Sequence, residues 1–120
     1  ENLINNSQNV DVLFHESMSL DLVNLINRNA ERTGATMAAK VTIDIQDYHT
    51  PIPDIVRAAQ KANVGHLVFY HHLPAPRNQL MENIMYRDVD EIMENWTASH
   101  DGTMLVLPID SDEIIITSVE

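Results

Sequence analysis

Three segments carry apolar residues at helical spacing, and each is expected to bury one face of a helix. The first follows Ser17 or Ser19, either of which can cap a helix, and it ends at Gly34. The second spans residues 53–63, which begin with a proline that is compatible with a helix start. The third and longest spans residues 79–95. The pattern therefore predicts three helices.

Short apolar runs outside these helices predict strands. The runs occupy residues 10–14, 66–70, 104–107 and 114–119. Residues 35–47 are ambiguous, although the alternation of Val41, Ile43 and Ile45 favours another strand. Strands that alternate with helices indicate an α/β fold, here a mixed sheet covered by about three helices. Because an apolar sheet has two faces, it needs a second cover from a missing N-terminal half or from a partner.

The length of 120 residues suits a single domain, residues 1–120. Seven Lys and Arg against 18 Asp and Glu give a net charge of −11, which argues against a nucleic-acid-binding surface on this chain. The absence of cysteine excludes a disulfide scaffold, a cysteine zinc site and a thiolate nucleophile. No apolar segment reaches the roughly 18 residues that a membrane helix needs, so no membrane partner is expected. The compartment stays open between cytoplasm and periplasm.

Two adjacent histidines, His71 and His72, follow the apolar run at residues 66–70. In open α/β sheets the carboxyl ends of the strands are where ligands bind, and a neutral imidazole there suits zinc. The alternative is a pair of solvated loop histidines, and spacing alone does not decide between these two readings.

Other histidines stand beside carboxylates. His49 precedes the second helix and could act as a general acid or base, with Asp47 or Asp44 as its orienting partner. His15 and Glu16 follow the first strand, where Glu16 could hold a histidine in one tautomer. Without further information, an ordinary loop role for His49 and an isolated His-Glu pair are the simpler interpretations.

Three stretches resemble the ribonuclease Z-like branch of the metallo-β-lactamase-fold hydrolases. Residues 11–17 (DVLFHES) are similar to the strand followed by His-Glu-Ala, and residues 48–62 (YHTPIPDIVRAAQKA) to the His-Ser/Thr-Thr segment and its alanine-rich helix. Residues 66–71 (HLVFYH) resemble the strand that ends in the last metal-binding histidine. The order of the three stretches matches that branch, as does the separation between the histidines in the second and third.

The resemblance implies an αββα sandwich with two zinc ions at its edge, whose bridging water attacks a phosphodiester or another ester-like bond. Carried over by position, His71 would be a zinc ligand, with His72 as its rival one residue along. His49 would protonate the leaving oxygen or hold the substrate phosphate. Glu16 and His15 would line or brace the site, and Asp47 would lie near it.

The resemblance is incomplete. The His-x-His-x-Asp-His motif of the superfamily does not occur in these 120 residues, nor does its further metal-binding histidine. The chain begins with Glu1 instead of Met and is expected to be the C-terminal half of such a fold. One histidine cannot hold two zinc ions, so the chain alone is expected to retain neither the metals nor the activity. The N-terminal half of the fold, or a second copy of the chain, would complete the site.

Two classes of function therefore stay open. The first is a zinc-dependent hydrolase of a phosphodiester or a small ester-like substrate, with nucleic acid bound only through segments that are missing here. The second is a non-catalytic α/β binding or interaction module, which could associate with itself to cover its bare sheet.

Overall fold

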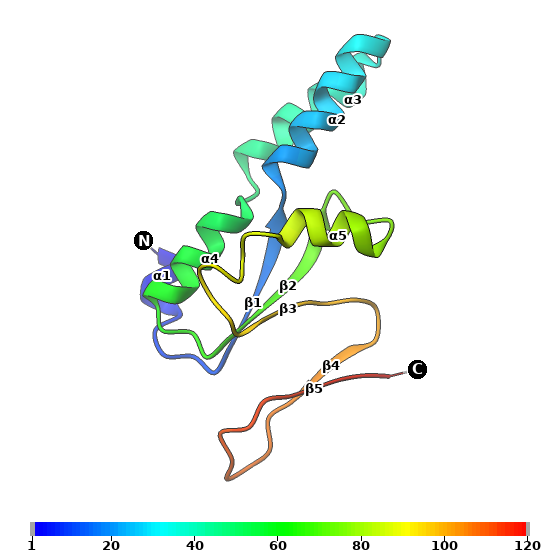
Figure 1. Cartoon of the computed structure of the whole chain (residues 1–120). Helices are drawn as coiled ribbons and strands as arrows, with labels where there is room; N and C mark the ends of the chain where they lie inside the picture. Colours follow the sequence, from blue (N-terminus) through cyan, green and yellow to red (C-terminus); the bar gives the residue numbers. More distant parts are fainter. Residues whose placement is uncertain (1, 120) are drawn as a thin grey trace.

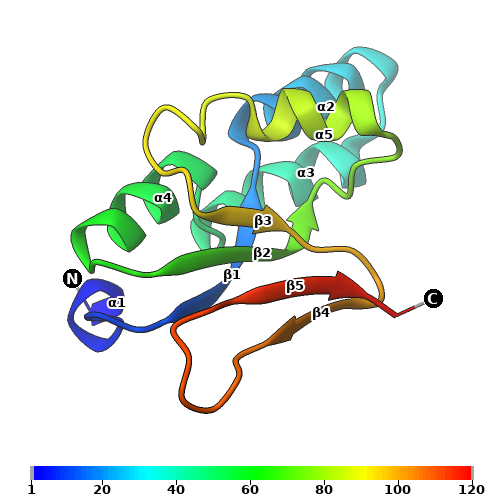
Figure 2. The same ribbon diagram turned by 60° about the horizontal axis from the view of Figure 1, so that its bottom comes forward.

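Three parallel strands form the central sheet of the protein, in the order β1-β2-β3 (Figures 1 and 2). They are β1 (Val12–Met18), β2 (His66–Leu73) and β3 (Trp96–Ala98). Parallel neighbours need crossover connections, and helices supply them. The first crossover contains α2 (Leu20–Thr33), α3 (Thr36–Asp44), a short 3-10 helix η1 (Ile45–Asp47) and α4 (Ile52–Lys61), whereas the second contains α5 (Gln79–Tyr86). This computed structural model describes residues 2–119 and confirms the α/β class; Glu1 and Glu120 of the expected domain lie outside the described residues.

The core lies between this sheet and α4. Ile55, Val56 and Ala59 on one face of α4 are fully buried, as are Leu67 and Phe69 of β2. Burying a side chain such as Ile55 or Val56 contributes about 1.5–3 kcal/mol. The predicted second helix and the predicted strand at residues 66–70 are therefore confirmed. The packing of α4 against β2 holds the central sheet in place, and with it the carboxyl ends of β1 and β2.

The strand favoured within residues 35–47 is wrong, because residues 36–44 form helix α3. Its buried positions, Ala39 and Thr42, are three residues apart and face α2, where the side-chain amide of Asn27 donates hydrogen bonds to the Ala39 carbonyl and to Thr42 Oγ1. Val41 and Ile43, whose alternation favoured a strand, are exposed. Alternation over three residues thus marked no buried sheet face.

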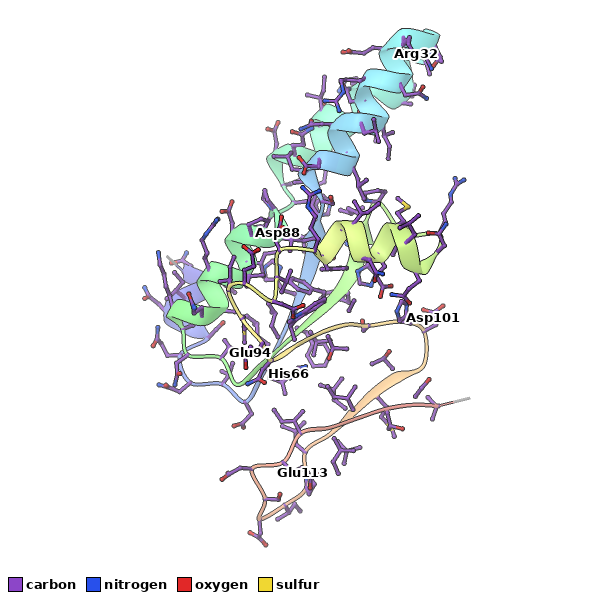
Figure 3. The ribbon with its side chains drawn as sticks, in the orientation of Figure 1. Arg32, His66, Asp88, Glu94, Asp101 and Glu113 are labelled. Carbon is purple, nitrogen blue, oxygen red and sulfur yellow. The ribbon has the colours of Figure 1, made fainter. Side chains whose placement is uncertain are left out.

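The two helices α2 and α3 form an arm that projects from the body of the protein (Figure 1). Ser19 caps α2 and Gly34, with φ of 74°, ends it, so these two predictions are confirmed, while Ser17 belongs to β1. Arg32 lies at the outer end of the arm (Figure 3). The arm helps to explain a radius of gyration of 16.1 Å, against about 14 Å for a compact domain of this length.

The predicted third helix is shorter than its apolar pattern, because α5 ends at Tyr86 and not at residue 95. The chain continues in turns, in which Val89 is buried and Ile92 and Met93 pack against the same core. The carbonyl of Ile92 accepts a hydrogen bond from the Gln60 side chain of α4, which ties this segment down without a helix. The apolar residues after Tyr86 keep a helical spacing because they pack against the core, although they do not form a helix.

A second, two-stranded antiparallel sheet closes the chain, so the strands fall into two sheets and not into the one mixed sheet expected. It consists of β4 (Thr103–Val106) and β5 (Ile115–Ser118), close to the predicted strands, and it lies on the side of the central sheet away from α4 and α5 (Figures 1 and 2). Glu113 lies near its outer end (Figure 3). A short helix, α1 (Asn2–Asn6), precedes β1 and was not predicted, because its sequence is mostly polar.

The face of the central sheet opposite α4 keeps exposed apolar groups. Phe14 of β1 is 54% exposed and Tyr70 of β2 is 49% exposed, on the face that also carries Glu16. Val68, which pairs with Phe14 on the same face, is fully buried, so the face is only partly exposed; the cover expected from a missing N-terminal half or a partner stays a prediction.

Candidate metal and acid–base site

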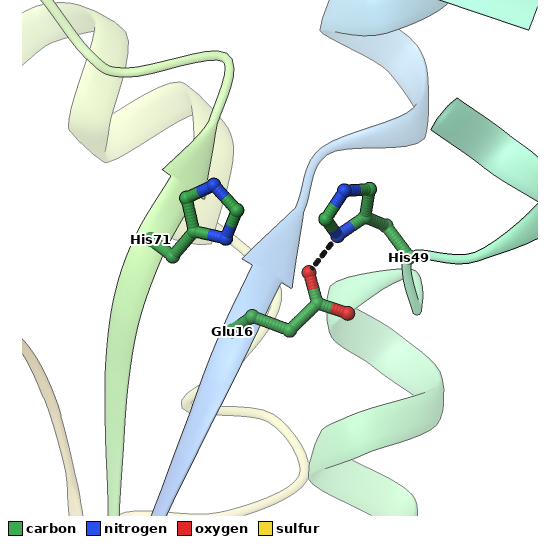
Figure 4. A group of neighbouring side chains, drawn as sticks. All are labelled: Glu16, His49 and His71. Carbon is green, nitrogen blue, oxygen red and sulfur yellow. Dashed lines mark hydrogen bonds and ion pairs between the residues drawn. The ribbon is translucent and has the colours of Figure 1, made fainter. Parts of the chain in front are cut away.

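Three side chains meet at the carboxyl ends of β1 and β2 (Figure 4). Glu16 comes from β1, His49 from the loop between η1 and α4, and His71 from β2. One potential ligand atom from each residue lies within 4.8 Å of the other two. Parallel strands bring their carboxyl ends to one edge, so residues 55 positions apart in the sequence, Glu16 and His71, become neighbours.

Glu16 is the central acceptor of this site. Its Oε2 atom accepts a hydrogen bond from Nδ1 of His49, and its Oε1 atom accepts one from the backbone N–H of Thr50 at 2.9 Å. The side chains of His49 and Glu16 are only 15% and 18% exposed, so little water competes for the bond between them. Because the carboxylate can only accept, His49 carries a proton on Nδ1, and its Nε2 atom is left for another partner.

The loop that carries His49 is anchored on both sides. The His49 N–H group donates to the carbonyl of Ile45 at 3.1 Å, which continues the turn of η1. Two residues later Pro51 bridges to Met18 in parallel register at the free edge of β1. These contacts place His49 beside the end of β1 although the whole α2–α3 arm separates it from Glu16 in the sequence.

His71 occupies a bulge in β2. Glu16 pairs with Tyr70 and Ser17 pairs with His72, which leaves His71 as the extra residue of β2. Its φ angle is 45°, in the left-handed region that non-glycine residues seldom adopt. The bulge places the His71 ring beside the His49 ring, with centroids 5.4 Å apart in an edge-on arrangement.

The rival metal ligand, His72, lies outside this group. Its Nε2 atom donates to the carbonyl of Ser99 at 2.7 Å, and its Nδ1 atom lies 2.5 Å from the hydroxyl of Tyr86. Both ring nitrogens are therefore occupied within the protein. The geometry favours His71 over His72 as the ligand, and the role itself stays a prediction.

Two other expected site residues take different places. The Nδ1 atom of His15 lies 2.9 Å from the carbonyl of Glu16, and its side chain points to the opposite face of β1. Asp47 is exposed and outside the group, so Glu16, and not Asp47 or Asp44, orients His49. Glu16 was expected to hold a histidine in one tautomer, but which histidine it holds could not be predicted, because His49 lies on another element.

The remaining histidines among residues 2–119 lie apart from the three. His66 places its Nε2 atom 2.8 Å from Thr97 Oγ1, and burial lowers the pKa of His66 below its ordinary value. His100 pairs with Glu82 at 3.1 Å near the surface. Neither residue is close enough to supply a further ligand to the group of Glu16, His49 and His71.

The donor set suits zinc in kind. Two imidazoles and one carboxylate, with an open position for water, form a common catalytic zinc site. Ligand atoms around a tetrahedral zinc ion are about 3.3 Å apart for bonds of about 2.0–2.1 Å, so a spread of up to 4.8 Å requires a modest closure of the side chains. Within residues 2–119 this is the one such group. All three residues can hold one ion only when the hydrogen bond between His49 and Glu16 is given up; while that bond stands, the His71 ring is the member of the group that is free to bind metal.

Comparison with known proteins assigns no family. No family model matches the sequence, and no curated protein matches it significantly. Among the described residues, none of the helices combines the length and the apolar character required to cross a lipid bilayer. The site must therefore be interpreted from its own geometry.

Proposed function

We propose that this chain is part of a metal-dependent hydrolase of the metallo-β-lactamase type. In this proposal, Glu16 and His49 form an acid–base pair and His71 is a metal ligand. The observation that carries the proposal is the convergence of these three side chains from separate elements at the carboxyl edge of a parallel sheet. The order of the sequence stretches that resemble the ribonuclease Z-like branch supports it.

The proposed role of the pair is proton transfer. Glu16 holds the imidazole of His49 through Nδ1 and stabilises the positive charge when the ring is protonated. The Nε2 atom of His49 can then deliver a proton to the leaving oxygen of an ester. The backbone N–H of Thr50 fixes the carboxylate, so that the imidazole points in one direction.

The proposed role of His71 is to hold zinc at the edge of this pair. A bound zinc ion would polarise the ester and lower the pKa of a bound water molecule. Since two zinc ions need more ligands than this chain offers, the others come from an N-terminal half of the fold or from a second copy of the chain. The chain by itself is accordingly expected to be inactive.

A phosphodiester or a small ester-like compound is the proposed substrate. The net charge of −11 disfavours direct binding of a long nucleic acid by this chain, so any contact with RNA would require basic groups from elsewhere. A small substrate needs only the metal and the acid–base pair.

A non-catalytic interaction module is the alternative. The exposure of Phe14 and Tyr70 on one face of the sheet favours it, because apolar groups that share an exposed face mark contact surfaces. This reading explains the small ligand set without a reaction, but it gives no reason for the meeting of Glu16, His49 and His71.

Zinc titration by calorimetry tests the proposal. We expect the purified chain to hold no zinc after dialysis and to bind added zinc reversibly, with His71→Ala weakening that binding by at least about tenfold. His100→Ala is the matched control, since His100 is exposed and pairs with Glu82 and not with Glu16, His49 or His71. Equal zinc binding by the wild type and His71→Ala would contradict the proposal. Hydrolysis of bis(p-nitrophenyl) phosphate by the zinc-loaded chain would contradict the expected inactivity.

A further inference from the structure

A chain of polar groups runs through the core directly behind the site. Ser17 of β1 is fully buried, and its hydroxyl lies 2.7 Å from the hydroxyl of Tyr86 on α5. The Tyr86 hydroxyl lies 2.5 Å from Nδ1 of His72, whose Nε2 atom reaches the Ser99 carbonyl at 2.7 Å. Four groups thus link β1, α5, β2 and the segment after β3.

The Ser99 carbonyl fixes the direction of the hydrogen bonds at the His72 ring. A carbonyl oxygen only accepts, so the proton of the neutral His72 ring is on Nε2 and its Nδ1 atom is an acceptor. The Tyr86 hydroxyl at 2.5 Å and the Ser17 hydroxyl at 3.1 Å both lie within donating distance of that atom, and the two hydroxyls lie 2.7 Å from each other. Burial raises the pKa of Tyr86 above its ordinary value, so this hydroxyl keeps the proton that it donates. Every member of the network is satisfied.

The hydrogen bonds of this network hold β2 at His72, the residue directly after His71. His71 has a φ of 45°, and a non-glycine residue keeps such a conformation only where its surroundings fix it. On the far side of the bulge, His72 is held at both ring nitrogens and is paired with Ser17. The next carbonyl, of Leu73, accepts a hydrogen bond from the Ser19 N–H at 2.8 Å.

We propose that His72 is a positioning residue: held by Tyr86 and Ser17 at one nitrogen and by Ser99 at the other, it keeps the bulge in β2 and so directs His71 toward Glu16 and His49. The use of His71 as a metal ligand rests on the proposed function. The placement of its ring does not, because it is a property of the chain without metal. His72 thus holds His71 in place.

Nuclear magnetic resonance of the metal-free chain tests the placement. In the wild type we expect His72 to carry its proton on Nε2 and cross-relaxation to connect the rings of His49 and His71. Tyr86→Phe removes the shorter of the two hydrogen bonds to Nδ1 of His72 and keeps the aromatic ring, so the cross-relaxation should weaken. Tyr70→Phe is the matched control, since it removes a hydroxyl on the same strand that has no hydrogen-bond partner in residues 2–119 and should change nothing. A His72 proton on Nδ1, or unchanged cross-relaxation in Tyr86→Phe, overturns the proposal.

Zinc affinity separates positioning from plain stability. Tyr86→Phe should raise the zinc dissociation constant by about tenfold while the variant still unfolds cooperatively. A lower melting temperature with unchanged zinc affinity would show a structural role alone. If Tyr86→Phe does not fold, Ser17→Ala gives the same test, because it removes one hydrogen bond and leaves both rings. A wild type that binds no zinc while Tyr86→Phe loses the ring contact would refute the proposed function and leave the positioning role standing.

Discussion

The Nδ1–H group of His49 donates a hydrogen bond to Oε2 of Glu16, although 33 positions separate the two residues in the sequence. The bond closes the edge of the sheet between β1 and the loop before α4. It also determines how a substitution of Glu16 should change the stability of the protein.

Replacing Glu16 by alanine should destabilise the protein by about 1–3 kcal/mol, because it leaves the Nδ1–H of His49 and the N–H of Thr50 without their partly buried acceptor. Glu16→Gln keeps an oxygen for one of these donors and should cost less. Urea denaturation of both variants measures the difference. Equal losses in the two variants would show that the acceptor atoms do not matter.

Replacing His71 by glycine should leave the protein at least as stable as replacing it by alanine, and more stable by up to about 1 kcal/mol. Glycine adopts a φ of 45° freely, whereas alanine keeps the strain of the bulge. Both variants should lose zinc affinity equally, since both lack the imidazole. Urea denaturation and zinc titration on the same samples check both parts, and a glycine variant less stable than the alanine variant would contradict the assignment of strain.

The stability of the protein should fall as the pH rises above 10. Burial raises the pKa of Tyr86 above its ordinary value of 10.0, so the folded state keeps a proton that the unfolded state releases. Below about pH 10 both states hold the proton and the group contributes no pH dependence; above it, the contribution falls by about 1.4 kcal/mol per pH unit until the folded state also ionises. Denaturation curves of the wild type and Tyr86→Phe between about pH 8 and pH 11 measure it, since other groups titrate alike in both. Parallel pH profiles would be the contrary result.

Phe14 should make the chain associate with itself or bind apolar dyes, because its ring is exposed on the sheet face that α4 does not cover. Phe14→Lys should reduce both effects without lowering stability, since it removes an exposed and not a buried contact. Sedimentation across a range of concentrations gives the mass. A wild type that stays monomeric and binds no dye would count against this surface as a contact site.

The sequence predicted those parts of the fold in which local pattern and final packing agree. The stripe of α4 and the apolar run of β2 are buried as their spacing indicates, and Gly34 ends α2 with the positive φ that glycine favours. The pattern failed for α3, whose buried residues are the small Ala39 and the polar Thr42, so that its buried face carried no hydrophobic signal.

The candidate site was predictable in its members but not in its connections. His49, Glu16 and His71 stand out because they follow strands or precede a helix. The bond between Glu16 and His49 and the bulge at His71 depend on how separate elements meet, which no spacing along the chain encodes. The hydrogen bonds that involve Ser17, Tyr86 and Ser99 could not be predicted from the sequence, because a serine or a tyrosine in an apolar stretch is common in protein cores and indicates no particular partner.

The α2–α3 arm also determines how much the length of the chain between Glu16 and His49 can change. Exposed loop tips are the preferred places for tolerated insertions, and Gly34 and Ala35, which join α2 to α3, form such a tip. The anchors of the pair, namely the strand end at Met18 and the bridge to Pro51, lie at the base of the arm and not along it. Residues near Gly34 can therefore be removed or added while Glu16 and His49 stay within reach of one another, which makes the tip of the arm the place where this protein can accept a shortened or inserted segment.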